Sequence, residues 1–312
     1  LARAQAELSV AYMGGLGVAE DASLGFGWAL KAAEHGDERA QFLVGTYYIQ
    51  GWGVERDDSK GVEWYLRAAQ LGCAPAQVQL GKYYHHRNSH ASPSLGVEWW
   101  TKAAEQENHP EAQYLLGCCC LGTAEAVAWF AKAAAQGYGL AQLELGRCYE
   151  RGAGVAQDFA QAASWYTKAA GLGVAAAQTC LGRCYQAGRG VARDYSAAIS
   201  WFTMAAGKGD ASAQYSLGMA YWKGLGCSLD ANQAVDWFSK AAEKGDVKAQ
   251  YRLGNCYKHG RGVDSQDYQK AVDWYSRAAV QGYARAQFSL ALCYCQGRGF
   301  RKDFSLAQEW FL

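Results

Sequence analysis

An Ala-Gln dipeptide recurs along the chain at almost constant intervals, and this periodicity constrains the fold more than any other feature of the sequence. The spacings are 36, 36, 36, 29, 36, 36, 36 and 37 residues, and a Trp recurs in step with them. A fixed period of this length is typical of repeat architectures, in which each unit packs against its neighbours. We therefore interpret residues 1–312 as a single solenoid domain, with repeats that start near residues 4, 40, 76, 112, 141, 177, 213, 249 and 286.

A Gly-x-Gly motif, which in some proteins precedes a phosphate-binding helix, belongs to this repeat. It occurs in seven repeats, and an Asp follows it each time. A turn that recurs with the scaffold is better explained by structure than by a single catalytic loop, and the Asp would repel phosphate. We expect the first glycine to end one helix and the Asp to cap the next one. The seven Asp residues are Asp21, Asp57, Asp158, Asp194, Asp230, Asp267 and Asp303.

The fifth repeat illustrates the unit. From Ala141, apolar residues fall at i, i+4, i+7 and i+8, which is one face of a helix that Gly152 ends. Gly146 leaves room for another helix to approach closely. Asp158 begins a second helix, and such helix pairs bury their faces only by stacking on their neighbours. The apolar face of the second helix carries Ala162, Trp165, Tyr166, Ala169 and Ala170.

The repeated string AQYxLGxCYxxGxGVxxDxxxAxxWYxKAAxxG resembles the Sel-one-like repeat (SLR) family, which is related to tetratricopeptide repeats. The resemblance covers essentially the whole chain, and the period of 36 with its Gly-x-Gly-Val turn differs from the 34-residue tetratricopeptide unit. It implies an all-α fold, a right-handed α-α superhelical solenoid of about eight and a half helix-turn-helix repeats. It also implies protein binding, with no catalytic residues and no cofactor.

Residues 85–123 depart from the pattern. The third repeat replaces its turn with a polar, His-rich stretch, and the fourth repeat is seven residues short and lacks the turn. His85, His86 and His90 suggest a metal, but zinc needs about four convergent ligands and no Cys shares a face with them. A solvated loop is therefore favoured over a metal site. The irregularity is either partner-specific or repeat decay, and decay is slightly favoured because loops tolerate change.

The composition excludes several classes. A net charge of +1 disfavours nucleic-acid binding, and no apolar run is long enough for membrane insertion. The eleven Cys include five at one repeat position, which we interpret as small buried hydrophobic residues, without the second Cys that a disulfide in every repeat needs. We infer an intracellular, reducing compartment, cytoplasmic or organellar if a segment before Leu1 was removed. The five are Cys119, Cys148, Cys184, Cys256 and Cys293.

The first helix of each repeat is expected to line a concave groove, by analogy with tetratricopeptide repeats. With the Ala of Ala-Gln as repeat position 0, positions 4, 5 and 8 are core and positions −1, 2, 6 and 9 form a separate stripe. The stripe varies between repeats, as a tailored binding surface would. Arg147 and Arg183 would clamp an acidic segment, beside an aromatic patch of Tyr215, Trp222 and Tyr251. The predicted groove residues are Phe42, Tyr114, Arg147, Arg183, Tyr215, Trp222, Tyr251 and Lys258.

The leading hypothesis is a non-enzymatic adaptor that binds protein segments in this groove. The alternative is a permanent structural subunit of a large assembly, held by broad surfaces; a hydrolase is disfavoured because no motif supplies a nucleophile with a base. Trp52 and Trp100 lie outside the repeated Trp position, Trp52 in a turn. The last repeat breaks off after Trp310 and Phe311, so this end is expected to continue into further repeats or to dock on a partner or a second copy.

Overall fold

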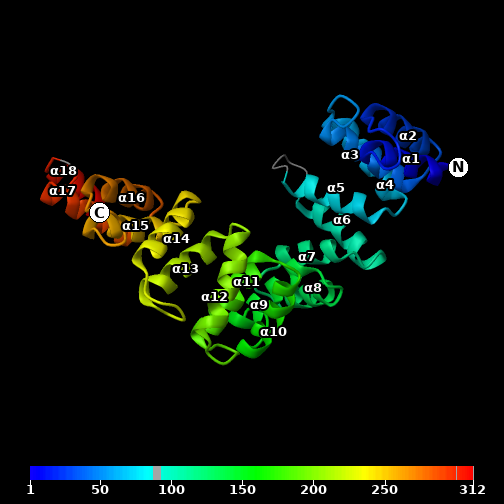
Figure 1. The fold of residues 1–312 in the computed structure, drawn as a ribbon. Helices are drawn as coiled ribbons and strands as arrows, with labels where there is room; N and C mark the ends of the chain where they lie inside the picture. Colours follow the sequence, from blue (N-terminus) through cyan, green and yellow to red (C-terminus); the bar gives the residue numbers. More distant parts are fainter. Residues whose placement is uncertain (87–92, 300, 312) are drawn as a thin grey trace. The chain divides into compact units, whose positions relative to one another are not determined.

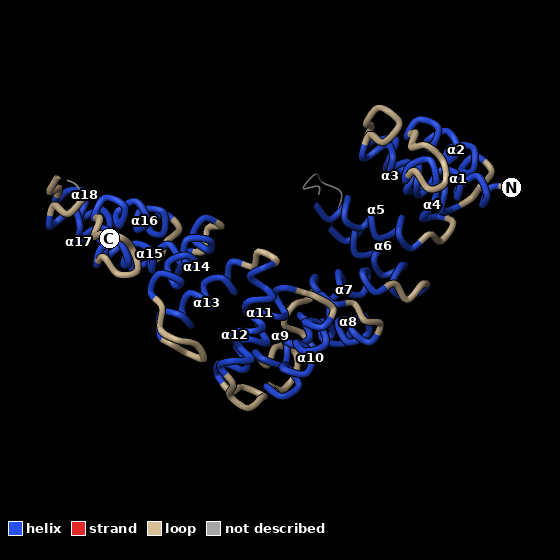
Figure 2. Tube along the Cα trace, in the orientation of Figure 1, coloured by secondary structure: helices blue, strands red, loops and turns tan. Residues whose placement is uncertain are grey.

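The structure is a computed structural model that describes residues 1–86, 93–299 and 301–311. These described residues form eighteen α-helices and no strand, joined by short loops (Figures 1 and 2). The first helices of the repeats are α1 (Ala2–Gly14), α3 (Glu38–Gln50), α5 (Ala74–His86), α7 (Pro110–Cys119), α9 (Gly139–Arg151), α11 (Ala175–Ala187), α13 (Ala211–Lys223), α15 (Val247–His259) and α17 (Ala284–Gln296). The second helices are α2 (Ala22–Glu34), α4 (Asp58–Gln70), α6 (Pro93–Gln106), α8 (Ala124–Ala135), α10 (Phe159–Gly171), α12 (Tyr195–Gly207), α14 (Ala231–Glu243), α16 (Tyr268–Val280) and α18 (Phe304–Phe311).

The chain forms two compact units. Unit 1 comprises Leu1–Ala141 with Ala153–Val155, and unit 2 comprises Gln142–Gly152 with Ala156–Leu312, so the boundary falls within α9. Within each unit, a first helix packs against its own second helix, and that second helix packs against the first helix of the next repeat. This is the stacking of an α-solenoid. A single solenoid domain over the whole chain stays a prediction.

The Gly-x-Gly turn is structural in two ways. The first glycine ends the first helix in the left-handed conformation, as Gly51 does with φ 72°. The second glycine also has positive φ, and a Cβ at Gly53 would collide with the carbonyl oxygen of Ala22, at the start of the preceding second helix. The Asp then caps the next helix, since the Asp57 carboxylate accepts the Lys60 N–H at 2.9 Å. All seven Asp predicted as caps accept such a bond.

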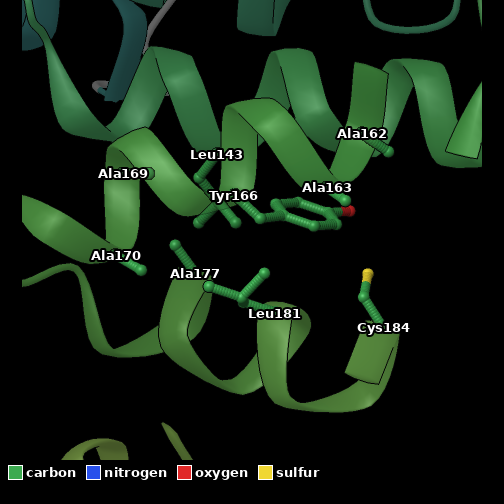
Figure 3. Packing of buried hydrophobic residues seen from close by; sticks show 9 residues of the cluster. All are labelled: Leu143, Ala162, Ala163, Tyr166, Ala169, Ala170, Ala177, Leu181 and Cys184. Carbon is green, nitrogen blue, oxygen red and sulfur yellow. The ribbon is translucent and has the colours of Figure 1, made fainter. Parts of the chain in front are cut away.

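In seven of the nine repeats, a buried aromatic ring lies directly over a glycine of the first helix. In the fifth repeat the Tyr166 ring is fully buried and lies above Leu181 and Cys184 of the next first helix (Figure 3). A Cβ at Gly146 would lie 2.6 Å from this ring, so the glycine admits the aromatic side chain. The other pairs are Gly45 with Tyr65, Gly81 with Trp100, Gly117 with Phe130, Gly182 with Phe202, Gly218 with Phe238 and Gly254 with Tyr275.

The repeated Trp is only half-buried, although the sequence placed it on the core face. Trp165 lies beneath the Lys168 ammonium group, 3.9 Å from the ring centroid, while the adjacent Tyr166 fills the core. A cation three residues further on covers the Trp in the same way in most repeats. These pairs are Trp28–Lys31, Trp64–Arg67, Trp99–Lys102, Trp129–Lys132, Trp165–Lys168, Trp237–Lys240 and Trp274–Arg277. The sixth repeat differs, since Met204 takes the place of the cation beside Trp201 and is 51% exposed.

The Gln of the Ala-Gln dipeptide is a buried hydrogen-bond donor. Gln178 is 1% exposed, and its Nε2 donates to the Ala170 carbonyl at 3.2 Å. This carbonyl lies in the last turn of the preceding second helix and also accepts the Gly173 N–H at 3.0 Å, so the Gln adds a second donor that ties this helix end to the next repeat. The same bond recurs from Gln41 to Ala33, Gln77 to Ala69, Gln214 to Ala206, Gln250 to Ala242 and Gln287 to Ala279. Repeat positions 0, 1, 4, 5 and 7 are therefore core, whereas the Tyr at position 8 is half-buried.

In and next to the irregular residues 85–123, other residue types occupy positions that hold glycine or Asp in the regular repeats. Asn108 takes a positive φ of 50° where other repeats have glycine, and Thr123 caps α8 in place of Asp, with its Oγ1 accepting the Ala126 N–H at 3.1 Å. The helix α7 ends at Cys119, which is consequently exposed. The prediction that Cys119 is buried is therefore wrong, whereas its four equivalents, Cys148, Cys184, Cys256 and Cys293, are buried as expected.

Several other sequence predictions concern side chains outside the core. His90 lies outside the described residues, as does the side chain of His86, and the described residues contain no group of three or more metal-binding side chains. Trp52 is 53% exposed in its turn, whereas Trp100 is buried at the core aromatic position. All eleven Cys are free thiols. Within the described part of the chain, no helix combines the length and apolar character needed to cross a membrane.

Candidate binding surface

The aromatic residues at repeat position 2 pack on the core ring of their own repeat. The Phe42 ring stacks on Tyr65 with centroids 5.5 Å apart, and the Tyr215 ring lies 5.9 Å from Phe238. Two of them also contact the residue before the next first helix: Tyr114 lies 5.4 Å from Tyr138, and Tyr251 lies 5.4 Å from Tyr283. The predicted groove aromatics are therefore half-buried, with one face packed against the scaffold.

Stripe positions of successive repeats meet side by side. The Lys82 ammonium at position 6 forms an ion pair with Glu111 at position −1 of the next repeat, with Nζ and Oε1 2.6 Å apart. Arg183, also at position 6, donates from Nη2 to the hydroxyl of Ser212 at position −1 of its next repeat, again at 2.6 Å. Positions 6 and −1 thus form one continuous surface within each unit, as the helical spacing predicts.

Arg147 does not share the setting of Arg183. Its Nη1 forms an ion pair with Glu144 of the same helix at 2.6 Å, and its side chain approaches Cys180. Burial raises the pKa of the Cys180 thiol, and the nearby guanidinium groups of Arg147 and Arg183 oppose this rise. The charge of Arg147 is therefore balanced within α9. The clamp of Arg147 and Arg183 on one carboxylate stays a prediction. Of the two, Arg183 lines a hollow of unit 2, which is described below.

Polar stripe residues also support the core where the core ring is Tyr. The Tyr166 hydroxyl donates to the Glu150 carboxylate at 2.6 Å, and the Tyr275 hydroxyl donates to the Asn255 side-chain oxygen at 2.8 Å. Burial and the hydrogen bond to Glu150 together raise the pKa of Tyr166. Sequence reasoning missed these bonds. A Tyr at a core position where another repeat has Phe could have indicated them, because a buried hydroxyl requires a hydrogen-bond partner.

Trp222 and Lys258 are engaged by neighbouring residues. The Trp222 ring lies 6.3 Å from Phe238, the ring that Tyr215 also contacts, so the structure brings two members of the predicted aromatic patch together. Arg261, from the next Gly-x-Gly turn, covers Trp222 with its guanidinium carbon 4.2 Å from the ring centroid. The third member, Tyr251, belongs to the next repeat and packs on Tyr275, the core ring of its own repeat. Lys258 is half-buried and approaches Cys293 of the next repeat.

Each unit has a hollow on its first-helix surface. The unit 1 hollow, of about 650 Å³, lies between α3, α4 and α5, and Phe42, Ile49, Val62 and Tyr83 give it an aromatic and aliphatic lining. Lys82 also lines it, but Glu111 balances that charge. Volumes of this order are typical of ligand sites.

The unit 2 hollow, of about 890 Å³, lies between α11, α12, α13 and the start of α15. Arg183 and Tyr215 line it together, so the structure joins two of the predicted groove residues in one hollow. Its lining also includes Met219 and two cations that sequence reasoning missed, Lys223 and Lys248. A comparison of charge between the first helices of the repeats would have found them.

Stacked helix pairs with a hollowed first-helix surface define a tetratricopeptide-like α-solenoid repeat protein. The chain belongs to the Sel1 repeat family, whose model, described as Sel1 repeat, matches it nine times. These repeats begin two residues before the Ala-Gln dipeptides, in the register that the sequence predicts. The matched residues are 2–37, 38–73, 74–108, 110–138, 139–174, 175–210, 211–246, 247–283 and 284–312.

Solved structures of the same family are similar over nearly the whole chain. A protective antigen present in uropathogenic Escherichia coli strains, with an SLR fold, is 30% identical with a TM-score of 0.73, over 99% of this chain and 75% of that one. A Sel1 repeat protein from Oxalobacter formigenes is 33% identical with a TM-score of 0.69, over 93% and 87%. Yeast Tom70 shares the fold alone, at 13% identity and a TM-score of 0.50 over 99% and 67%. No curated protein matches the chain.

Proposed function

We propose that this Sel1 repeat chain is a non-enzymatic interaction scaffold that binds segments of partner proteins along its first-helix surface. The observation that carries the proposal is the contrast between fixed and variable repeat positions. The core positions keep the same residue types from repeat to repeat, whereas positions −1, 2, 6 and 9 change and contribute to the hollows of both units. A packed scaffold with a variable hollowed face is what recognition of a specific partner requires.

The predicted groove residues contribute to this surface in different ways. Phe42 lines the unit 1 hollow, while Arg183 and Tyr215 line the unit 2 hollow. We propose that these three make direct contacts and that the others shape the surface around them. The others are Tyr114, Arg147, Trp222, Tyr251 and Lys258. Eleven free thiols support function in an intracellular, reducing compartment, with the cytoplasm as our proposal.

Cross-linking mass spectrometry of partner complexes captured from cell extract tests the site. We expect the cross-links to fall on the first helices, and we expect the variant Phe42→Ala, Arg183→Glu, Tyr215→Ala to lose the partners while its circular dichroism stays helical. Lys240→Glu is the matched control, because Lys240 covers Trp237 on a second helix and lines neither hollow among the described residues. Partners that stay bound to the triple variant and cross-link to the second helices would favour a structural subunit held by broad surfaces.

A further inference from the structure

The four first helices that lie entirely in unit 2 carry an unbalanced positive charge. Helices α11, α13, α15 and α17 contain no Asp or Glu. Within the described part of the chain, none of their Lys and Arg side chains forms an ion pair with a carboxylate. The surplus is local, because the whole chain has a net charge of only +1. The six cations are Arg183, Lys223, Lys248, Arg252, Lys258 and Arg285.

Three of these cations converge on the unit 2 hollow. Arg183 comes from α11, Lys223 from the last turn of α13 and Lys248 from the first turn of α15, and all three are exposed. The acidic group in the lining, Asp246, is already engaged, since its carboxylate accepts the Ala249 N–H at 2.8 Å as the cap of α15. The hollow therefore presents guanidinium and ammonium donors to whatever enters it.

The same hollow offers apolar contacts between the charges. Tyr215, Met219, Leu225 and Val247 belong to its lining, and the Tyr215 ring is held in place by Phe238. A polyanion that presents only phosphates would leave these aliphatic groups uncovered. A peptide that places an apolar side chain between carboxylates would use both parts of the lining.

We propose that the unit 2 hollow binds an extended acidic peptide segment of another protein, with its carboxylates on Arg183, Lys223 and Lys248 and an apolar side chain against Tyr215 and Met219. The inference rests on the proposed function and adds the chemistry of the partner. Arg183 supplies directed contact, because its guanidinium has five N–H donors and Ser212 uses only one of them. The exposed ammonium groups add attraction that salt screens.

The test begins with a random 12-residue peptide library displayed on phage and selected against the wild-type chain. We expect the selected peptides to be enriched in Asp and Glu around an apolar residue. The best peptide is then synthesised with a fluorophore, beside an analogue with every Asp changed to Asn and every Glu to Gln. Fluorescence anisotropy should show that the amide analogue binds at least about tenfold more weakly and that salt weakens the acidic peptide.

Two sets of variants locate the binding. Arg183→Glu, Lys223→Glu, Lys248→Glu should weaken the acidic peptide by more than about tenfold, and the milder Arg183→Gln, Lys223→Gln, Lys248→Gln should weaken it in the same direction. Arg39→Glu is the matched control, because Arg39 occupies in unit 1 the repeat position that Lys248 occupies in unit 2, and it should leave binding unchanged. Circular dichroism of every variant checks the fold.

The outcomes separate this inference from the proposed function. Selected peptides without acidic enrichment, or equal binding of the amide analogue, would overturn the acidic ligand while peptide binding to the surface stands. Tighter binding of a 12-nucleotide single-stranded DNA through the same cations would overturn the peptide in favour of a nucleic acid. Peptide cross-links confined to the second helices would overturn both proposals.

Discussion

In unit 1, the first helices α1, α3, α5 and α7 carry three cations and three acids, and in unit 2 the helices α11, α13, α15 and α17 carry six cations and no acid. Two of the unit 1 pairs are in contact, Arg3 with Glu7 at 3.5 Å and Lys82 with Glu111 at 2.6 Å. The equivalent of Glu111 in the seventh repeat is Ser212, which leaves most of the donors of Arg183 available.

Packing does not account for this difference, because both units use the same core. Gly45 admits Tyr65 in unit 1 as Gly182 admits Phe202 in unit 2. In both units a buried Gln donates to a carbonyl at the end of the preceding helix. The repeat therefore fixes the residues that join helices and leaves the first-helix stripe free to differ. Under the proposed function this stripe contacts the partner, so its local charge indicates the chemistry of that partner.

The two hollows show the same contrast on a smaller scale. The unit 1 hollow has Phe42 stacked on Tyr65 and one cation, Lys82, which Glu111 balances. The unit 2 hollow has three cations and one engaged acid in its lining. We infer that apolar contacts dominate recognition in unit 1 and charge in unit 2, so ionic strength should weaken only the second.

The shared core is the part of the comparison where substitutions should have the largest effect. Gly45→Ala and Gly182→Ala each place a Cβ 2.6 Å from a buried ring, so we expect each to lower the free energy of unfolding by about 2 kcal/mol. Urea unfolding followed by circular dichroism measures this as a lower midpoint. Equal losses in the two units would confirm a common core, and a loss in one unit alone would contradict it.

A glycine without close neighbours is the control for that substitution. Gly27 lies inside α2, and a Cβ there would have no atom within 4 Å. Gly27→Ala should therefore raise the free energy of unfolding by about 0.5–1 kcal/mol, because Ala is the better helix former.

The repeat register, the helix pairs, the glycine turns and the Asp caps could all be predicted from the sequence, because each recurs with the period. The close approach at Gly146 could be predicted, since a Cβ there would lie 3.3 Å from the Ala162 carbonyl oxygen of α10, whereas the Tyr166 ring at 2.6 Å was not predicted as its nearest neighbour. Which of two adjacent aromatic side chains is buried could not be predicted, since Trp165 and Tyr166 differ by only 100° around the helix. Three-dimensional packing decides which one is buried.

The candidate site was less predictable than the fold. Helical spacing placed Arg183 and Tyr215 on one stripe, and the structure puts them in one hollow. Lys223 lies outside the stripe and Lys248 lies on it at position −1, and they come from two different helices, so only the stacked repeats bring both to Arg183. Local pairing also escapes a stripe analysis, as the ion pair of Arg147 with Glu144 shows.

The buried Gln should give the next largest effect. Gln77→Met and Gln178→Met keep the approximate shape of the side chain but remove one of the two donors to the Ala69 and Ala170 carbonyls, which still accept the N–H groups of Gly72 and Gly173, so each should cost about 0.5–1.5 kcal/mol of stability. Midpoints of urea unfolding measure the loss. Gln161→Met, at an exposed site in α10, is the control and should change stability by less than about 0.5 kcal/mol. A similar loss at the control would assign the effect to Met itself.

Exchanging the contacts between positions 6 and −1 should exchange the local charge balance at Lys82 and Arg183. Ser212→Glu gives Arg183 the acidic neighbour that Lys82 has, and we expect about 0.5–1 kcal/mol of added stability with weaker binding of the selected acidic peptide. Glu111→Ser removes the acid from Lys82 and should cost about 0.5–1 kcal/mol. Unfolding midpoints and peptide anisotropy measure the two effects. Unchanged peptide binding by Ser212→Glu would show that the charge at Arg183 is not part of the site.

The smallest expected effect lies on the second helices, where the two units are otherwise alike. Met204→Lys would give Trp201 the cation that Lys168 supplies to Trp165, and an exposed cation–π contact of this kind contributes about 0.5 kcal/mol. Lys168→Met should lose a similar amount, and both shifts should persist in 0.5 M NaCl better than that of Ser212→Glu, because the ring contact includes packing of the lysine stem. A change in peptide binding by Met204→Lys would contradict the assignment of recognition to the first helices, since this substitution adds positive charge only to α12.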